Sequence, residues 1–158
     1  MIGVREVADR VLRAITDDGA FRVITVRSTE TVRGALAAQK PGKASKIFAD
    51  LITGAILVRE TMSPDLRVQA IMQSGDNKSS MVADAHPDGS TRGLLRMPSD
   101  NDGTFPASGA LLQVARTGHA GALLQGVVEV PPSGDVSDAL MSYMQTSEQV
   151  VSMIAVGT

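Results

Sequence analysis

The sequence predicts an α+β fold in which a mostly antiparallel sheet has helices packed on its faces. Three observations lead to this fold class. Apolar residues recur every three to four positions in segments 44–60 and 135–144, as in helices with one buried face. From position 65 onward the period changes to two. Short turns with Gly or Pro separate the alternating segments, as in hairpins, and the whole chain is predicted to form one globular domain.

The first segment is predicted to be an amphipathic helix that ends near Asp17-Asp18-Gly19, a turn signal. Charged residues interrupt its apolar stripe, which excludes a signal peptide. Residues 21–26 then alternate as a strand. The apolar residues at helical spacing are Val4, Val7, Ala8, Val11 and Ile15.

Two helices are expected next. The run Ser28-Thr29-Glu30-Thr31 supplies a candidate N-cap for a short helix that continues to about Gln39, and Pro41-Gly42 ends it. A longer helix follows from about Ala44 to Glu60, and its broad apolar stripe suggests cover on more than one side. That stripe consists of Ile47, Phe48, Leu51, Ile52, Ala55, Ile56 and Val58.

A strand and two hairpins are predicted for the middle of the chain. Residues 65–73 alternate between apolar and mostly polar side chains, which indicates a strand. In the first hairpin, Pro87-Asp88-Gly89 contains an Asp-Gly pair that suits a tight reversal with a residue at positive φ. The segments expected to pair are 81–85 with 91–97, and 110–117 with 122–130.

A C-terminal helix and a final strand complete the predicted fold. Asp135 is a suitable N-cap, and Ser147-Glu148-Gln149 separates the helix from the apolar run 150–156, which is predicted to be a strand. No general packing rule requires these three polar residues at that position, so they point to a family as well as to a fold. The buried face of the helix is predicted at Val136, Ala139, Leu140, Tyr143 and Met144.

Charge and composition exclude several function classes. The formal net charge is −2 and the Lys and Arg residues are scattered, which argues against nucleic acid and against a membrane surface as partners. The chain has no cysteine, which rules out disulfides, thiolate nucleophiles and cysteine-bound zinc within these residues. No uncharged stretch has the length of a transmembrane helix, so a soluble cytoplasmic protein is expected.

Motifs that carry catalytic or cofactor chemistry are incomplete. The run 41–45 resembles a phosphate-binding loop, but it lacks the first Gly and the Ser or Thr after Lys43. Asp84 and His86 lie on the same side of a predicted strand and His119 is the only other histidine, but no third metal ligand is evident. We therefore predict no catalytic residue, no cofactor and no metal site. An enzyme remains a third hypothesis, which requires an apolar pocket where Asp84, His86 or His119 converge.

Short matches to a known family follow one another in order along nearly the whole chain. The run from Tyr143 to Gln149 is the most specific of them. The others are Arg13-Ala14, Asp18-Gly19, Arg22, Ser28-Thr29-Glu30-Thr31-Val32, the strand 66–72, Gln73-Ser74-Gly75-Asp76, Arg92-Gly93 and Gln125-Gly126-Val127-Val128. Together these residues resemble heat shock protein 33, a family of redox-regulated holdase chaperones.

The resemblance implies that residues 1–158 form an N-terminal chaperone domain, usually a homodimer, with a role in the stress response. Such a domain binds unfolding client proteins on exposed apolar surface without ATP. Family members normally continue into a helical linker and a small zinc domain, whose four cysteines form an oxidation switch. Because this chain ends at Thr158 without a cysteine, we expect both parts and the switch to be absent. The alternative is a dimeric binding or assembly module that has lost chaperone activity.

Methionines provide the candidate residues for a client-binding or dimer surface. The run 150–156 has apolar side chains on both faces, which is typical of a buried core strand. The other interpretation is an exposed patch lined by Met and Val, because adaptable Met side chains suit promiscuous binding. The candidates for this surface are Met72, Met81 and Met97.

Overall fold

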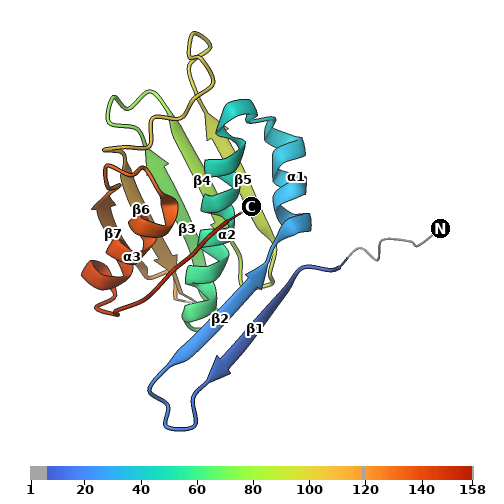
Figure 1. Ribbon diagram of the computed structural model, residues 1–158, viewed down its shortest axis with the longest axis vertical. Coiled ribbons are helices and arrows are strands. Elements are labelled where there is room, and N and C mark those ends of the chain that lie inside the picture. Colours follow the sequence, from blue (N-terminus) through green and yellow to red (C-terminus); the bar gives the residue numbers. More distant parts are fainter. Residues whose placement is uncertain (1–6, 119, 158) are drawn as a thin grey trace, which may run out of the picture.

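The α+β fold class is confirmed by the computed structural model of the protein, which describes residues 7–118 and 120–157 (Figure 1). The described residues form two antiparallel sheets, three α-helices and one short 3₁₀ helix, η1. In chain order, the elements are β1 (Arg10–Ile15), β2 (Arg22–Arg27), α1 (Thr29–Gln39), η1 (Gly42–Ala44), α2 (Ser45–Thr61), β3 (Arg67–Gln73), β4 (Ser80–Ala85), β5 (Thr91–Arg96), β6 (Leu111–Thr117), β7 (Leu123–Glu129) and α3 (Val136–Ser147).

The main sheet has five strands in the order β5-β4-β3-β6-β7, and every neighbouring pair is antiparallel. Both predicted hairpins are confirmed, as β4–β5 and β6–β7. The first one turns at Asp88-Gly89, where Gly89 has a φ of 90°, a conformation that glycine adopts without steric cost. In β3, Val68, Ala70 and Met72 are buried and the residues between them are half-buried, which confirms the predicted alternation.

All three α-helices lie on one face of the main sheet (Figure 1). α2 crosses β3, β4 and β5, α3 lies on β6 and β7, and α1 lies beside α2 over β5. As its broad apolar stripe predicts, α2 also contacts α3 and β2 on sides that the sheet does not cover. Among the residues described, no helix combines the length and the apolar character that crossing a membrane requires.

α2 carries the centre of the core. Phe48, Leu51 and Ile52 are completely buried between this helix and the sheet. Gly93 on β5 allows the helix to approach, because a Cβ at that position would lie 3.0 Å from Phe48 Cε2 and 3.1 Å from Ile52 Cδ1. The Arg92-Gly93 match in the sequence therefore has a packing reason.

The prediction of an N-terminal helix is wrong. Residues 10–15 form β1, which pairs with β2, while residues 7–9 belong to no helix or strand and Val4 lies outside the described residues. Val11 and Ile15 fit one face of a helix, but they also share one face of a strand, and both residue types favour strands. Antiparallel pairing with the correctly predicted strand β2 decides between the two. The β1–β2 hairpin projects from the body of the molecule (Figure 1).

The predicted strand at residues 150–156 is also wrong. Residues 150–157, here called the C-terminal tail, run extended across α2 and have no ladder partner among the described strands (Figure 1). The period of two is retained, since Ile154 and Val156 pack against the core while Val151 and Met153 are 91% and 98% exposed. The sequence pattern predicts an extended backbone correctly, but a strand also needs a neighbour, which the pattern does not specify.

Hydrogen bonds at both ends attach the C-terminal tail to α3. The Val150 N–H donates to the Met144 carbonyl at 3.0 Å, and the Val156 N–H donates to Ser137 Oγ at 3.0 Å. Because Met144 and Ser137 lie near opposite ends of α3, the tail runs back along the helix that precedes it. Its backbone direction is therefore fixed by a helix rather than by a sheet.

Candidate functional site

Two of the three methionines predicted to form a binding surface are in the core. Met72 and Met81 lie opposite each other on β3 and β4, on the face that the helices cover, and both are completely buried. Met97 follows β5, is half-buried and packs against the core. The prediction for Met72 and Met81 is wrong because strand alternation identifies two faces without saying which one the helices cover.

Asp84, which was considered for a metal or catalytic site, is held in an ion pair with Arg67. Arg67 donates to Asp84 from Nε at 2.8 Å and from Nη2 at 2.7 Å. These bonds hold the pKa of Asp84 below its usual value, and His86 Nε2 lies 3.2 Å from the same carboxylate. Within 7–118 and 120–157, no three His, Asp or Glu residues gather as a metal site would require. His119 lies outside the described residues.

The side of the main sheet that faces away from the helices is here called the open sheet face (Figure 1). One register row crosses all five strands on this face, because Val82 pairs with Leu94 and Ile71, and Gln113 pairs with Ile71 and Val127. Four of these five side chains are apolar. Leu94 and Val127 are 49% and 53% exposed, so the row is an apolar stripe that solvent reaches.

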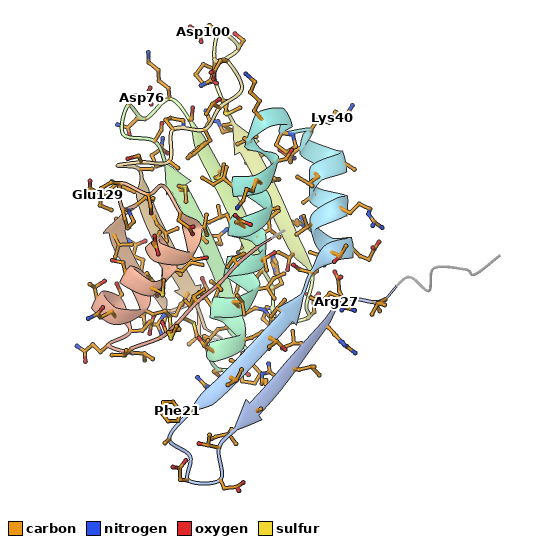
Figure 2. The ribbon with its side chains drawn as sticks, in the orientation of Figure 1. Phe21, Arg27, Lys40, Asp76, Asp100 and Glu129 are labelled. Atoms are coloured by element: carbon orange, nitrogen blue, oxygen red, sulfur yellow. The ribbon has the colours of Figure 1, made fainter. Side chains whose placement is uncertain are left out.

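Mostly polar rows border this apolar stripe on both sides. Gln113, the polar member of the stripe, donates to Gln125 Oε1 at 2.9 Å. Arginines lie at the β5 end of the flanking rows and Glu129 lies at the β7 end, as its label in Figure 2 shows. The flanking rows are Arg92, Asp84, Gln69, Ala115 and Gln125, and Arg96, Ser80, Gln73, Leu111 and Glu129.

The sequence contains a signal for this apolar stripe that reasoning from methionines missed. In the predicted strand, Ile71 shares a face with Gln69 and Gln73, so it is an apolar residue on the otherwise polar face. Val82 has the corresponding position on β4, and the register places it opposite Ile71. Apolar residues on the polar face of an amphipathic strand mark surface that is exposed for a reason other than core packing.

A second group of exposed apolar side chains lies on the β1–β2 hairpin. Leu12, Ile15, Phe21 and Val23 are each more than half exposed, and Phe21 reaches 70% at the end far from the body (Figure 2). The hairpin turn is ordered by Thr16, whose Oγ1 accepts a hydrogen bond from the Phe21 N–H at 3.0 Å. The hairpin therefore presents apolar side chains on a defined backbone.

Charged contacts attach this hairpin to the C-terminal end of α2. Arg22 Nη2 donates to the Thr61 carbonyl at 3.0 Å, which satisfies a group at the helix end and suits the helix dipole. Arg13 forms an ion pair with the buried Glu60, which also pairs with Arg59. Arg13 and Arg22, both among the residues that match the family, therefore have a structural role.

The N–H groups in the first turn of α1 donate to a side chain from outside the run predicted to cap it. Asp9 accepts hydrogen bonds from the N–H groups of Glu30 at 2.9 Å and Thr31 at 2.7 Å. Burial raises the pKa of Asp9, but these bonds and one from the Thr31 hydroxyl outweigh it, so the pKa lies below its usual value. Ser28 is the N-cap residue, as the predicted run allows, but its side chain makes no cap hydrogen bond. Its hydroxyl instead lies 2.7 Å from that of Thr53 on α2.

The run that ends in Ser147-Glu148-Gln149 attaches α3 to the sheet. The buried Tyr143 hydroxyl donates to Glu148 Oε1 at 2.5 Å, and Arg116 Nε on β6 lies 3.2 Å from the same oxygen. Burial, together with the neighbouring carboxylate, raises the pKa of Tyr143 further above its usual value of 10.0, at which the hydroxyl is already a donor at neutral pH. The most specific of the family matches is therefore a structural contact rather than part of an exposed surface.

Comparisons with known proteins agree on one family. A family model described as Hsp33 protein matches residues 9–158. A 33 kDa chaperonin from Gloeothece citriformis is 29% identical over 162 residues, which cover 95% of this chain and 54% of that protein. A 33 kDa chaperonin from a Picosynechococcus species is 26% identical, with coverages of 95% and 54%. The chain therefore spans about half the length of the curated relatives it matches.

A solved structure supports the same fold. The crystal structure of a 33 kDa chaperonin, a heat shock protein 33 homolog from Thermotoga maritima, matches this chain with a TM-score of 0.73. The match covers 89% of this chain and 52% of that one at 20% sequence identity. At this identity the likeness shows the fold alone. These relatives carry the name of a chaperonin and not that of an enzyme.

Proposed function

Because the chain belongs to the Hsp33 protein family, we propose that it is an ATP-independent holdase that binds unfolding proteins on exposed apolar surface. The observation that carries this proposal is the apolar stripe on the open sheet face, formed by Leu94, Val82, Ile71 and Val127. Leu94, Val82 and Ile71 are adjacent in this row and Gln113 separates them from Val127, and apolar surface on a water-exposed face marks a site of interaction. Fully burying a Leu or Val contributes roughly 1.5–3 kcal/mol, so half-exposed side chains contribute about half as much each.

The shape of this surface suits partners of many sequences. A sheet face is broad and shallow, and its polar rows keep it hydrated when no client is present. Binding through the apolar stripe requires only that a client expose apolar side chains, which unfolding proteins do. Such a surface therefore selects for the unfolded state rather than for one partner.

The region that resembles a phosphate loop supports a mechanism without ATP. Residues 42–44 form η1, and the Ser45 hydroxyl donates to the Gly42 carbonyl at 2.6 Å. Ala44 stands where a phosphate loop has the Ser or Thr whose hydroxyl binds the metal ion of the nucleotide, so this ligand is missing from the run. In this proposal, clients bind and leave according to how much apolar surface they expose.

The absence of cysteine from these 158 residues leads us to propose a surface that does not depend on a thiol switch. The apolar stripe is exposed on the folded chain without any segment having to move away. We therefore expect the same holdase activity after treatment with a thiol oxidant such as diamide and after treatment with a reductant. A change of activity between the two would contradict this part of the proposal.

A dimeric assembly module is the second candidate, and the charges on the open sheet face favour it. Arg92 and Arg96 lie at the β5 edge of this face, and Glu129 lies at the β7 edge. Two copies stacked face to face with opposite orientation would bring arginines of one copy over Glu129 of the other. The same apolar stripe would then be buried between two copies rather than against a client.

The two candidates are separated by following the light scattering of a thermally unfolding enzyme together with the size of the protein in solution. The holdase proposal predicts suppression of scattering by the wild type. Val127→Lys and Leu94→Lys should weaken this suppression several-fold, because they place charges in the apolar stripe. The matched control is Ala38→Lys on the exposed side of α1, which should retain it.

Each outcome of this experiment decides between the candidates. No suppression at several-fold molar excess removes the holdase function. A stable dimer that fails in the scattering assay, and that Val127→Lys converts to a monomer, supports the assembly module. Suppression that both sheet variants retain in full contradicts the role of the open sheet face.

A further inference from the structure

A groove of about 690 Å³ lies on the helical side of the molecule, away from the open sheet face. Its base is formed by Ala49 and Thr53 of α2, and Val32 and Leu36 of α1 form one wall. The end of β2 forms another side from Val26 onward, and the C-terminal tail reaches the groove at its end. The groove is therefore apolar at its base and bordered by a strand.

β2 has a ladder partner on one edge only. The Thr16 N–H donates to the Phe21 carbonyl at 2.9 Å, so these two residues form a hydrogen-bonded pair of the hairpin. In antiparallel ladders such pairs alternate along the strands. By the β1–β2 register, the N–H and C=O groups of Arg22, Ile24 and Val26 therefore point to the other edge, where no described strand lies. Val26 brings this unpaired edge to the groove.

The charges that line the groove are all positive. Arg27, Arg33 and Lys46 are among its lining residues, and no Asp or Glu is, but Arg33 already pairs with Glu30 and Lys46 with Asp50. Arg27 is exposed at the end of β2 that is nearer the body (Figure 2). Arg27 therefore favours a partner with carboxylates at this end of the groove and disfavours a partner with lysines.

We propose that an extended peptide segment with alternating apolar and acidic side chains binds in this groove by adding a third strand to the β1–β2 sheet at the free edge of β2. The inference rests on the holdase function proposed above, since an unfolded client supplies the segment. Main-chain hydrogen bonds to Ile24 and Val26 give affinity independent of sequence, and the apolar base together with Arg27 selects side chains. A seven-residue segment spans roughly 23 Å when extended, enough to cover β2.

The proposal is tested with three fluorescein-labelled peptides of seven residues on the full chain, followed by fluorescence anisotropy. The first has Val at alternate positions and Glu between them. The second has Lys in place of Glu, and the third is the Glu peptide with every internal backbone nitrogen methylated, which removes the donors that strand addition needs. We expect the Glu peptide to bind at least tenfold more tightly than either of the other two. Equal affinities for all three peptides overturn the proposal.

Two variants, with one control, test whether the peptide binds in this groove. Arg27→Glu should weaken binding of the Glu peptide and strengthen binding of the Lys peptide, whereas Lys78→Glu in the exposed β3–β4 turn should change neither. Val32→Phe fills the groove and should weaken binding of the Glu peptide. The comparison between the methylated and the unmethylated Glu peptide uses only the wild-type protein, so the proposal can be refuted even if a variant fails to fold. Peptide binding that Arg27→Glu and Val32→Phe leave unchanged overturns the assignment to this groove.

The outcomes also separate this inference from the holdase proposal. If the wild type suppresses scattering but binds none of the peptides, strand addition is overturned and the holdase function stands. If the Glu peptide binds as expected but scattering is not suppressed, the peptide site stands, but the proposal that its occupant is an unfolded client is overturned. Hydrogen exchange of residues 22–26 that slows with protein concentration in the absence of peptide would assign the edge to a second copy, and would overturn the proposal.

Discussion

Gly126→Ala tests whether the close fit between β7 and α3 stabilises the fold. A Cβ at Gly126 would collide with Ser147 Oγ, and it would lie 2.8 Å from Ser147 Cβ and 2.9 Å from Tyr143 Cε2. Ser147 can rotate its hydroxyl away, but its Cβ is fixed by the backbone of α3. The Tyr143 ring is held by the hydrogen bond to Glu148 and by burial. Either α3 or β7 must therefore shift when the methyl group is added.

The expected magnitude follows from two opposing contributions. Overpacking a well-packed interior costs about 1–3 kcal/mol, and replacing Gly by Ala offsets about 0.4–1 kcal/mol by restricting the unfolded chain. We expect the free energy of unfolding to fall by roughly 1–2 kcal/mol, which lowers Tm by about 2–8 °C for a domain of this size. Urea unfolding followed by far-UV circular dichroism measures the difference.

Gly34→Ala is the matched control, because a Cβ at Gly34 on α1 meets no atom within 4 Å. It should raise the free energy of unfolding by about 0.5–1 kcal/mol, since Ala is favoured over Gly in a helix. Ser147→Gly removes the Cβ that Gly126→Ala would meet, so the double variant should show a favourable coupling of at least ~0.5 kcal/mol. If Gly126→Ala is as stable as the wild type, or if the coupling is absent, the steric argument is refuted.

Two further predictions concern Asp84 and the β1–β2 hairpin. Arg67 lowers the folded-state pKa of Asp84, so the stability from this pair is present above the usual pKa of 3.8 and is lost as pH falls through the lowered value. Asp84→Asn should therefore weaken the fall in the free energy of unfolding with decreasing pH, measured by urea titrations at several acidic pH values. An unchanged dependence on pH would contradict a role for the ion pair. Arg22→Ala removes the hydrogen bond to the Thr61 carbonyl and should raise hydrogen exchange in β1 and β2 but not in β3. An equal rise in β3 would indicate global destabilisation instead.

Elements decided by local chemistry were predictable from the sequence. The Asp88-Gly89 turn places both strands of a hairpin, and Asp135 caps α3 by accepting a hydrogen bond from the Ser137 N–H at 2.7 Å. In both cases the deciding contacts join residues at most a few positions apart. Propensity and turn chemistry describe such contacts directly.

The N-terminal strand and the C-terminal tail were not predictable, because distant segments decide them. Val11 and Ile15 fit a helix face or a strand face equally well, and pairing with β2 selects the strand. The period of two in residues 150–156 is present in the structure, but α3 and α2 lie against that segment instead of another strand. A local pattern indicates which side chains turn inward without indicating what they pack against.

The matches that suggested the family turned out to be mostly structural. Gly93 and Gly126 allow helices to approach the sheet. Arg22 donates a hydrogen bond to a carbonyl at the C-terminal end of α2, and Glu148 joins α3 to β6. The surface proposed for clients has a different origin, since it is built from ordinary aliphatic residues that are unusual only in their exposure. A motif search finds the first kind of residue, and only the fold shows the second.

By itself, the sequence determined the fold class, the two hairpins of the main sheet, the extents of α1 and α2, the start of α3, and the absence of thiol chemistry within these residues. Only the tertiary structure decided that β1 is a strand, that Asp9 accepts hydrogen bonds from the first turn of α1, that Met72 points into the core and that Ile71 lies on an open face. The physical reason is the range of the interactions. Propensities and turns act between near neighbours, whereas burial depends on which distant helix comes to lie on which side of a sheet.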